Sequence, residues 1–172
     1  MRAFTPEITK LPSASILTIK TIGNPNSAAQ SGIGALYGTA YTTKFKVYKP
    51  KGKTMEIGCL SAEWPNAHLA PKSKWIGNWS LEVPSFVTKT ALIQKDTKHK
   101  VKLSKRPAGT FAQILHLGPY SAEGPTIRKL HIFVKDQGYV LAGPHEEVYL
   151  TKPDAKVMKT VIRYRIKKIA AK

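Results

Sequence analysis

One order of elements occurs twice along this chain, and the repetition constrains the fold more than any other feature. Each half reads as a strand, a turn, a long helix and then two more strands. Asn24-Pro25-Asn26-Ser27 precedes the first long helix, and Gly118-Pro119-Tyr120-Ser121 precedes the second. The two halves share a pattern rather than letters. We therefore expect an α+β fold made of a duplicated β-α-β-β module.

Hydrophobic spacing predicts the elements of the first half. β-Branched residues at 15–22 indicate an extended opening segment. Apolar residues recur at spacings of three and four over residues 27–47, which predicts an amphipathic helix despite three internal glycines. Residues 54–64 and 74–83 read as an antiparallel hairpin. A shorter helix is predicted over residues 85–94, with a basic connection after it.

The second half is punctuated by glycine and proline. Ser121 is the expected N-cap of its helix, and Gly138 is expected at the C′ position where that helix ends. Four segments of this half read as strands: 110–117, 139–141, 145–150 and 159–166.

The expected architecture is a single domain, 1–172, with module one over about 1–95 and module two over about 108–168. Side by side, two such modules would form a curved antiparallel sheet with two long helices on one face. The other face would hold a ligand groove at the pseudo-twofold junction.

Glu147 and Tyr149 are the first candidates for a functional site. They lie two residues apart in a short apolar run, so both point to one face of the predicted strand. A carboxylate on the inner face of a sheet costs desolvation energy unless a partner or a ligand uses it. Two interpretations stay open: Glu147 lines a small-molecule pocket, or it is tied to one of the 28 lysines and arginines.

Composition bounds the function. No run of about 18 apolar residues occurs and the N-terminus lacks an apolar leader, so we expect a soluble, cytoplasmic protein with no membrane partner. Cys59 is the one cysteine, which excludes an internal disulfide. The net charge of +18 predicts attraction to polyanions, or else a solvated lysine-rich surface. The basic residues match no helix-turn-helix or zinc-finger frame, which argues against specific nucleic-acid recognition.

Metal, cofactor and nucleophile motifs are missing. No histidine pair has metal-ligand spacing with a carboxylate, so no metal site and no cofactor are predicted. A Gly-x-Ser-x-Gly nucleophile motif does not occur. His116 alternates with Ile114 and Ala112 on one strand face, and a hydrogen-bonded structural histidine is favoured there over a catalytic one.

A set of short segments carries a resemblance to a known family. In the second half they are 109–120, 125–127, 130–131, 138–139, 147–150 and 160–163, and in the first half 23–26, 35–37, 40–42, 44–45, 72–75 and 86–88. These segments resemble the GyrI-like small-molecule-binding proteins, over nearly the whole chain and most specifically in the second half.

The resemblance implies the effector-domain fold of multidrug-responsive transcription regulators, here without a DNA-binding domain. In that family a duplicated module encloses an aromatic-lined pocket with a glutamate, whose place Glu147 takes. Some stand-alone members hydrolyse the strained cyclopropane of DNA-alkylating natural products, and others bind only. The expected ligand contacts are Glu147, Tyr149, Trp64, Trp75, Tyr41, Tyr120, Tyr37 and His116.

Three functions follow as hypotheses. The first is binding of an apolar or cationic aromatic compound, for sensing or sequestration, by a monomer or a homodimer. The second is hydrolysis of cyclopropane-bearing toxins, with Glu147 as the catalytic residue. The third is a polyanion-binding or inhibitory partner protein acting through its basic surface. Ser61, Pro65 and Gly77 depart from the family pattern, and these changes favour binding over hydrolysis.

Overall fold

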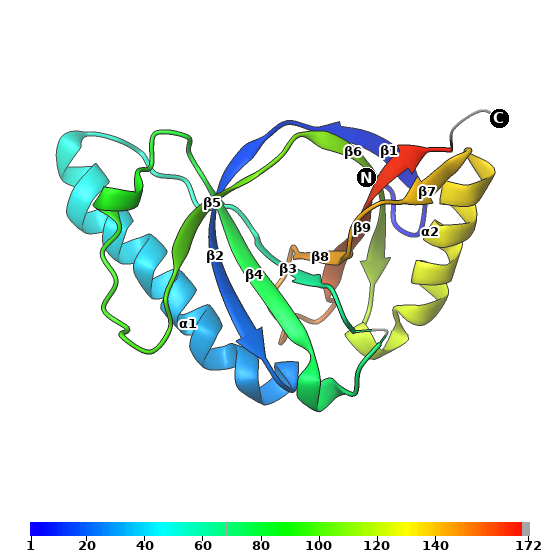
Figure 1. Cartoon of the computed structure of the whole chain (residues 1–172), viewed down its shortest axis with the longest axis horizontal. Coiled ribbons are helices and arrows are strands. Elements are labelled where there is room, and N and C mark those ends of the chain that lie inside the picture. Colours follow the sequence, from blue (N-terminus) through cyan, green and yellow to red (C-terminus); the bar gives the residue numbers. More distant parts are fainter. Residues whose placement is uncertain (68, 170–172) are drawn as a thin grey trace. The chain divides into compact units, whose positions relative to one another are not determined.

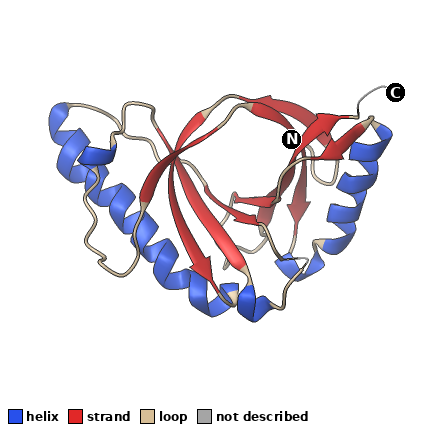
Figure 2. Ribbon diagram, viewed as in Figure 1, coloured by secondary structure: helices blue, strands red, loops and turns tan. Residues whose placement is uncertain are grey.

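The computed structural model describes residues 1–67 and 69–169, and the chain divides into two compact units. The first unit is Ser13–Pro107, and the second combines Met1–Pro12 with the chain from Ala108 onward. Each unit contains antiparallel strands and one long α-helix (Figure 1, Figure 2). The predicted α+β class is therefore confirmed.

The first unit is a four-stranded antiparallel sheet with a helix on it. Its strands pair in the order β3-β4-β2-β5. Their bounds are β2 Ala14–Ile22, β3 Leu60–Trp64, β4 Ile76–Val83 and β5 Lys102–Arg106. Helix α1, Pro25–Thr43, packs on β2 and β4 and continues into a π-helical turn, Lys44–Tyr48. The predicted helix and antiparallel hairpin are confirmed, but the first hairpin strand begins at Leu60 and not at residue 54.

A glycine lets α1 approach the sheet closely. A Cβ atom at Gly32 would lie 2.6 Å from Cγ2 of Thr21 on β2, far inside van der Waals contact. Gly32, which lowers the intrinsic helix propensity, is therefore required by packing.

The shorter helix predicted over residues 85–94 is wrong. That segment holds only a 3-10 turn, Lys89–Ala91. Its local backbone hydrogen bonds span three residues, and two of its amides donate to distant side chains. The amide of Thr88 donates to the Tyr48 hydroxyl at 3.1 Å, and the amide of Ile93 donates to the Thr43 hydroxyl at 3.0 Å. Within the basic connection that follows, β5 is a strand that the sequence did not predict. Its lysines are typical of an edge strand, but they obscure the apolar–polar alternation by which a strand is recognised in the sequence.

The second unit repeats this arrangement. Its strands pair antiparallel in the order β1-β6-β9-β8, and β7 pairs with the far end of β9. Their bounds are β1 Glu7–Leu11, β6 Gly109–Leu117, β7 Tyr139–Leu141, β8 His145–Tyr149 and β9 Lys159–Lys168. Helix α2, Gly124–Asp136, packs its buried Leu130 and Val134 on residues of β6 and β9.

The two units share strand order and turn geometry. In each, one strand leads into the helix and two later strands follow, so that β3-β4-β2 corresponds to β8-β9-β6. The glycines after β2 and β6, Gly23 and Gly118, have φ angles of 129° and 126°. The predicted duplication is thus present in the backbone.

The two units take their fourth strand from different places. β5 closes the first unit's sheet from within that unit, whereas β1 comes from the start of the chain and pairs with β6. Met1–Pro12, which we expected in module one, therefore lies in the second unit, and the basic connection up to Pro107 lies in the first.

Candidate functional site

Strand β8 directs two neighbouring glutamates to opposite faces of the second unit's sheet, because side chains alternate along a strand. Glu146 opposes Arg163 of β9 in register. Its carboxylate accepts hydrogen bonds from Arg163 Nε at 2.7 Å and Nη2 at 2.5 Å, and both residues are buried. Glu146 is therefore a structural ion-pair partner.

Glu147 lies on the face that α2 covers. It opposes Ile162 of β9, and directly opposed residues in an antiparallel pair share a face. Ile162 belongs to the core that contacts Leu130 of α2. We expected the groove on the face away from the helices, but the register of β8 places Glu147 on the helix face. The register of a strand depends on its pairing with a strand that is distant in sequence. The alternation of apolar and polar residues along one strand does not reveal that pairing.

A chain of hydrogen bonds holds the Glu147 carboxylate. Nε2 of His145 lies 2.9 Å from Oε1 of Glu147, and the Tyr149 hydroxyl donates to Oε2 at 2.7 Å. On the far side of His145, Nδ1 lies 2.6 Å from the hydroxyl of Tyr164. His145, Glu147 and Tyr149 alternate on β8, and Tyr164 comes from β9, so two strands position the network. The side chain of Glu147 is only 13% exposed.

Glu123 completes the cluster from the start of α2. It is the N-cap residue of that helix, but its side chain makes no capping hydrogen bond. The residue is 4% exposed, and its Oε1 has no hydrogen-bond partner among the described residues. Burial, the negative charge of Glu147 and a hydrogen bond to Glu147 together raise the pKa of Glu123 to about 8. At neutral pH this carboxyl group therefore holds a proton beside the Glu147 carboxylate.

Aromatic rings border the cluster. Tyr120 contacts Tyr149 edge to face, with ring centroids 5.6 Å apart. Burial, followed by the charges of Glu147 and Glu123, raises the pKa of both Tyr120 and Tyr164. The ring of His131, on α2, lies 4.9 Å from that of Tyr164, and burial and His145 lower the pKa of His131. Glu147, Tyr149 and Tyr120, all expected as ligand contacts, thus come together in one unit.

His116 stands apart from this cluster. It is buried, with Nδ1 2.9 Å from the Thr126 hydroxyl and Nε2 3.3 Å from the Pro119 carbonyl oxygen. Both ring nitrogens thus have partners that tie β6 to the start of α2. These contacts are those of a structural histidine.

The other expected contacts belong to the first unit. Trp64 packs against Trp75 and Trp79 with ring centroids 5.7 and 5.2 Å away. Trp64 is 5% exposed, and its indole N–H has no hydrogen-bond partner among the described residues. On α1, the rings of Tyr37 and Tyr41 stack 6.1 Å apart. Trp64 and Trp79 are buried, Trp75 is half-buried, and Tyr41 is exposed.

Glu123, His145 and Tyr164 are members of the cluster that the sequence did not single out. His145 had a usable signal, because it precedes Glu147 by two residues and therefore shares its strand face. The sequence pattern predicts Ser121 as the N-cap of this helix. That N-cap is wrong: Tyr120–Ala122 forms a 3-10 turn, so α2 begins later and Glu123 becomes its N-cap.

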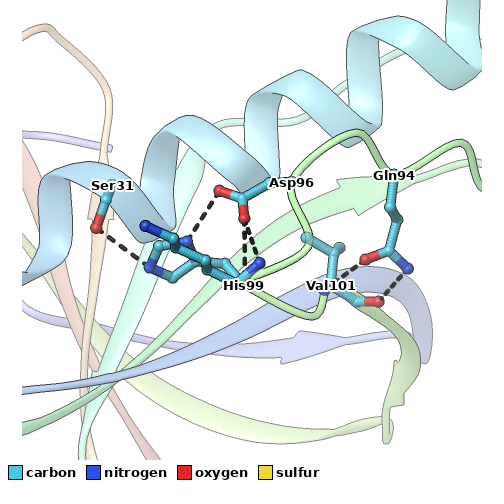
Figure 3. Close-up of polar contacts among 6 residues, drawn as sticks. Ser31, Gln94, Asp96, His99 and Val101 are labelled. Atoms are coloured by element: carbon cyan, nitrogen blue, oxygen red, sulfur yellow. Dashed lines mark hydrogen bonds and ion pairs between the residues drawn. The ribbon is translucent and has the colours of Figure 1, made fainter.

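One further hydrogen-bonded chain lies in the first unit. The Ser31 hydroxyl lies 3.2 Å from Nε2 of His99, whose Nδ1 lies 2.9 Å from Oδ2 of Asp96 (Figure 3). This is the connectivity of a Ser-His-Asp triad, but the Asp96 side chain is 35% exposed. Beside it, Gln94 pairs with the backbone of Val101 through two hydrogen bonds of 2.9 Å (Figure 3). These contacts fasten the loop after residue 94 to α1 and to itself.

A cavity of about 300 Å³ borders that loop. Its lining includes Leu92, Gln94 and Val101 together with Lys89, Lys100 and Lys102. None of the residues expected to contact a ligand lines it. The cavity is therefore separate from the Glu147 cluster.

Comparison with known proteins identifies relatives. A family model described as the GyrI-like small molecule binding domain matches residues 4–167. Among curated proteins, no sequence matches. No helix in the described part of the chain is both long and apolar enough to cross a membrane.

Three solved structures share the fold. A hydrolase from Listeria innocua has 25% sequence identity, with a TM-score of 0.81 over 97% of this chain and 94% of that one. An uncharacterized conserved protein from the same organism has 23% identity, with a TM-score of 0.83 over 96% and 93%. The EcmrR C-terminal domain has 17% identity, with a TM-score of 0.69 over 96% and 98%.

Proposed function

The chain belongs to the GyrI-like small-molecule-binding domain family, and from this premise we propose that it binds a flat, cationic organic compound at Glu147 for sensing or sequestration. The observation that carries the proposal is the state of the Glu147 carboxylate. It is nearly enclosed, it is held by neighbouring side chains, and no lysine or arginine is paired with it among the described residues.

The alternative interpretation of Glu147 was an ion pair with a surface cation. The chain has 28 lysines and arginines, so a carboxylate that is only 13% exposed and is paired with none of them among the described residues is informative. The neighbouring Glu146 shows the contrast, since it takes Arg163 in a two-point pair. A carboxylate in a partly desolvated site attracts a cation more strongly than one in water, because the effective dielectric constant is lower.

Aromatic rings beside the carboxylate favour a flat ligand. Tyr149 donates to Glu147 and contacts Tyr120, so hydroxyl and ring surfaces lie next to the charge. A ligand cation over a tyrosine face gains a further ~0.5–2 kcal/mol. Trp64, Trp75, Tyr41 and Tyr37 of the first unit stay predicted ligand contacts, to be tested by substitution.

Replacing Glu147 by glutamine is the direct test. We expect Glu147→Gln to weaken binding of ethidium, a flat aromatic cation, by about tenfold or more, which corresponds to ~1.4 kcal/mol. Binding of phenanthridine, its neutral parent ring system, should change by less than about twofold on the same scale. Isothermal titration calorimetry, with quenching of tryptophan fluorescence as a second signal, measures both.

A surface carboxylate supplies the matched control. Glu82 pairs with Arg106 and its side chain is 54% exposed, so Glu82→Gln should leave ethidium affinity unchanged. Equal losses in the two variants would show that net charge, not the site, attracts the ligand. Absence of any binding of flat aromatic cations to the wild-type protein would overturn the proposal.

Hydrolysis is the second candidate function, and the protonated Glu123 favours it. An acid that holds its proton at neutral pH lies beside a carboxylate, an arrangement suited to general acid–base catalysis. Glu147 would take a proton from a water molecule while the oxygen of that water attacks an activated cyclopropane carbon. The ring C–C bond breaks, its electron pair moves into the conjugated carbonyl, and Glu123 protonates that group. The 25% identity to a hydrolase from Listeria innocua adds support.

The Glu147→Gln variant also separates the two functions. If the protein is a hydrolase, this variant should not turn over a spirocyclopropane dienone. The loss of the dienone's absorbance measures the turnover. Binding of phenanthridine would persist. A wild-type protein that binds ethidium but leaves the dienone intact is a binder only.

A further inference from the structure

We propose that Glu123, His145 and Glu147 form a binding site for a divalent transition-metal ion, of which Zn²⁺ fits the donor set best. Nothing in the family description calls for a metal. The site goes beyond the small-molecule binding proposed above and does not depend on it.

The geometry carries the inference. One potential ligand atom from each of the three residues lies within 4.8 Å of the other two. The residues come from the start of α2 and from alternate positions of β8, so regular elements hold all three. A nitrogen and two carboxylate groups converging on one point are ligands of the kind found in zinc sites with an open coordination position.

An independent observation points to a missing cation. Glu123 is 4% exposed, yet its Oε1 has no hydrogen-bond partner among the described residues. Its side chain makes no helix-capping bond either, although it stands at the N-cap position where an acceptor is normally used. A buried carboxyl oxygen without a hydrogen-bond partner is costly, and a metal ion bound there would satisfy it.

The surroundings match the outer shell of a metal site. Metal-bound histidines usually hydrogen-bond through their other ring nitrogen to an oxygen atom, which orients the ring. Nδ1 of His145 lies 2.6 Å from the Tyr164 hydroxyl, so Nε2 can turn its lone pair to a metal while Nδ1–H donates to Tyr164. Likewise the Tyr149 hydroxyl donates to Oε2 of Glu147 at 2.7 Å. Oε1 of Glu147 and Nε2 of His145 lie 2.9 Å apart, and the ion would take the place of the proton between them.

Charge and donor type select the ion. Two adjacent carboxylates repel each other, and a divalent cation bound between them would relieve that repulsion. The net charge of +18 repels cations, but salt screens this repulsion beyond about 8 Å at physiological ionic strength. The imidazole ligand favours Zn²⁺ over Mg²⁺ or Ca²⁺, which prefer oxygen ligands only.

Metal titration of the full chain tests the site. The protein, stripped with EDTA and dialysed, should bind one Zn²⁺ per chain in isothermal titration calorimetry and bind Mg²⁺ far more weakly. Glu123→Gln and His145→Gln should each lower the Zn²⁺ affinity by at least tenfold. Tyr164→Phe keeps all three ligands but removes the oriented partner of His145, and should lower affinity by about 10- to 100-fold.

His99→Gln is the matched control, because His99 and Asp96 form a histidine–carboxylate pair in the first unit. It should leave the Zn²⁺ affinity unchanged. Zn²⁺ binding that survives Glu123→Gln and His145→Gln, or that disappears with His99→Gln, overturns the proposal. If Glu123→Gln fails to fold, Tyr164→Phe and the visible spectrum of Co²⁺ in the wild-type protein decide the question.

The two proposals fail separately. Ethidium binding measured in EDTA tests the small-molecule site without metal, and Zn²⁺ titration without ethidium tests the metal site alone. Ethidium binding in EDTA combined with no Zn²⁺ binding would leave the proposed function standing and remove the metal.

Discussion

Adjacent glutamates on β8 differ in what they do, because one residue along a strand changes the face of the sheet. Glu146 meets Arg163 and is neutralised, whereas Glu147 meets a histidine, a tyrosine and a second carboxyl group. The same residue type therefore serves stability at one position and the candidate site at the next.

This contrast gives a stability prediction at the residue scale. Glu146→Gln leaves the Arg163 charge buried without its partner and should lower the free energy of unfolding by about 3–5 kcal/mol. Glu147→Gln removes a charge from a pair of carboxyl groups and should change it by less than about 1 kcal/mol. Urea denaturation followed by circular dichroism measures both. A larger loss in Glu147→Gln than in Glu146→Gln would contradict the assignment of the two faces.

At the element scale, each unit uses a glycine to turn from the strand that precedes its helix into the segment that leads to that helix. Gly23 and Gly118 have φ angles of 129° and 126°, a region that residues with a Cβ rarely adopt. The repeated conformation explains why glycine stands at both places although the following residues differ. It also shows that the duplication resides in backbone geometry more than in side chains.

A pair of glycine substitutions tests these local roles. Gly118→Ala should lower the free energy of unfolding by about 1–3 kcal/mol through backbone strain, since a Cβ there meets nothing closer than 3.6 Å. Gly34, exposed within α1, has nothing within 4 Å of an added Cβ, so Gly34→Ala should raise stability by roughly 0.5–1 kcal/mol. Thermal and urea unfolding measure both, and shifts of the same sign would contradict this account.

Helix beginnings also show how context overrides local signals. Asn24 caps α1 by accepting a hydrogen bond from the Asn26 amide at 3.1 Å, as its residue type favours. Glu123 stands at the equivalent position of α2 and turns its carboxyl group away from the helix toward Glu147. A capping position has thereby become part of the candidate site.

At the scale of the whole molecule, the charge of +18 is the feature that the site does not explain. Basic residues occur along the whole sequence, so any binding to polyanions should be electrostatic and independent of base sequence. We expect weak binding to a mixed-sequence DNA duplex that falls steeply as salt rises from about 50 to 200 mM. Fluorescence anisotropy at several salt concentrations measures it.

Glu147→Gln separates this surface effect from the site. The variant should leave DNA affinity unchanged while it weakens ethidium binding. DNA binding that persists at high salt and distinguishes base sequences would instead support the polyanion-binding hypothesis as the main function.

Local patterns predicted much of this protein. Period-two alternation identified β8 and the shared face of Glu147 and Tyr149, and three- and four-residue spacing identified both long helices. The repeated element order predicted the duplicated α+β module. These succeeded because periodicity and turn chemistry depend on residues that are close in sequence.

Only the tertiary structure decided which distant residues meet. The strand pairings place Glu147 opposite Ile162, Tyr164 beside His145, and β1 on the second unit rather than the first. The helix predicted over residues 85–94 does not form, and two amides of that segment donate hydrogen bonds to the hydroxyl groups of Tyr48 and Thr43. The sequence by itself determined the elements and the face that carries Glu147 and Tyr149. The pairing register of β8 and the packing of α2 decided that Glu123 and His145 join Glu147 and Tyr149. Such contacts bring together residues that are far apart in sequence, so a short stretch of sequence does not predict them.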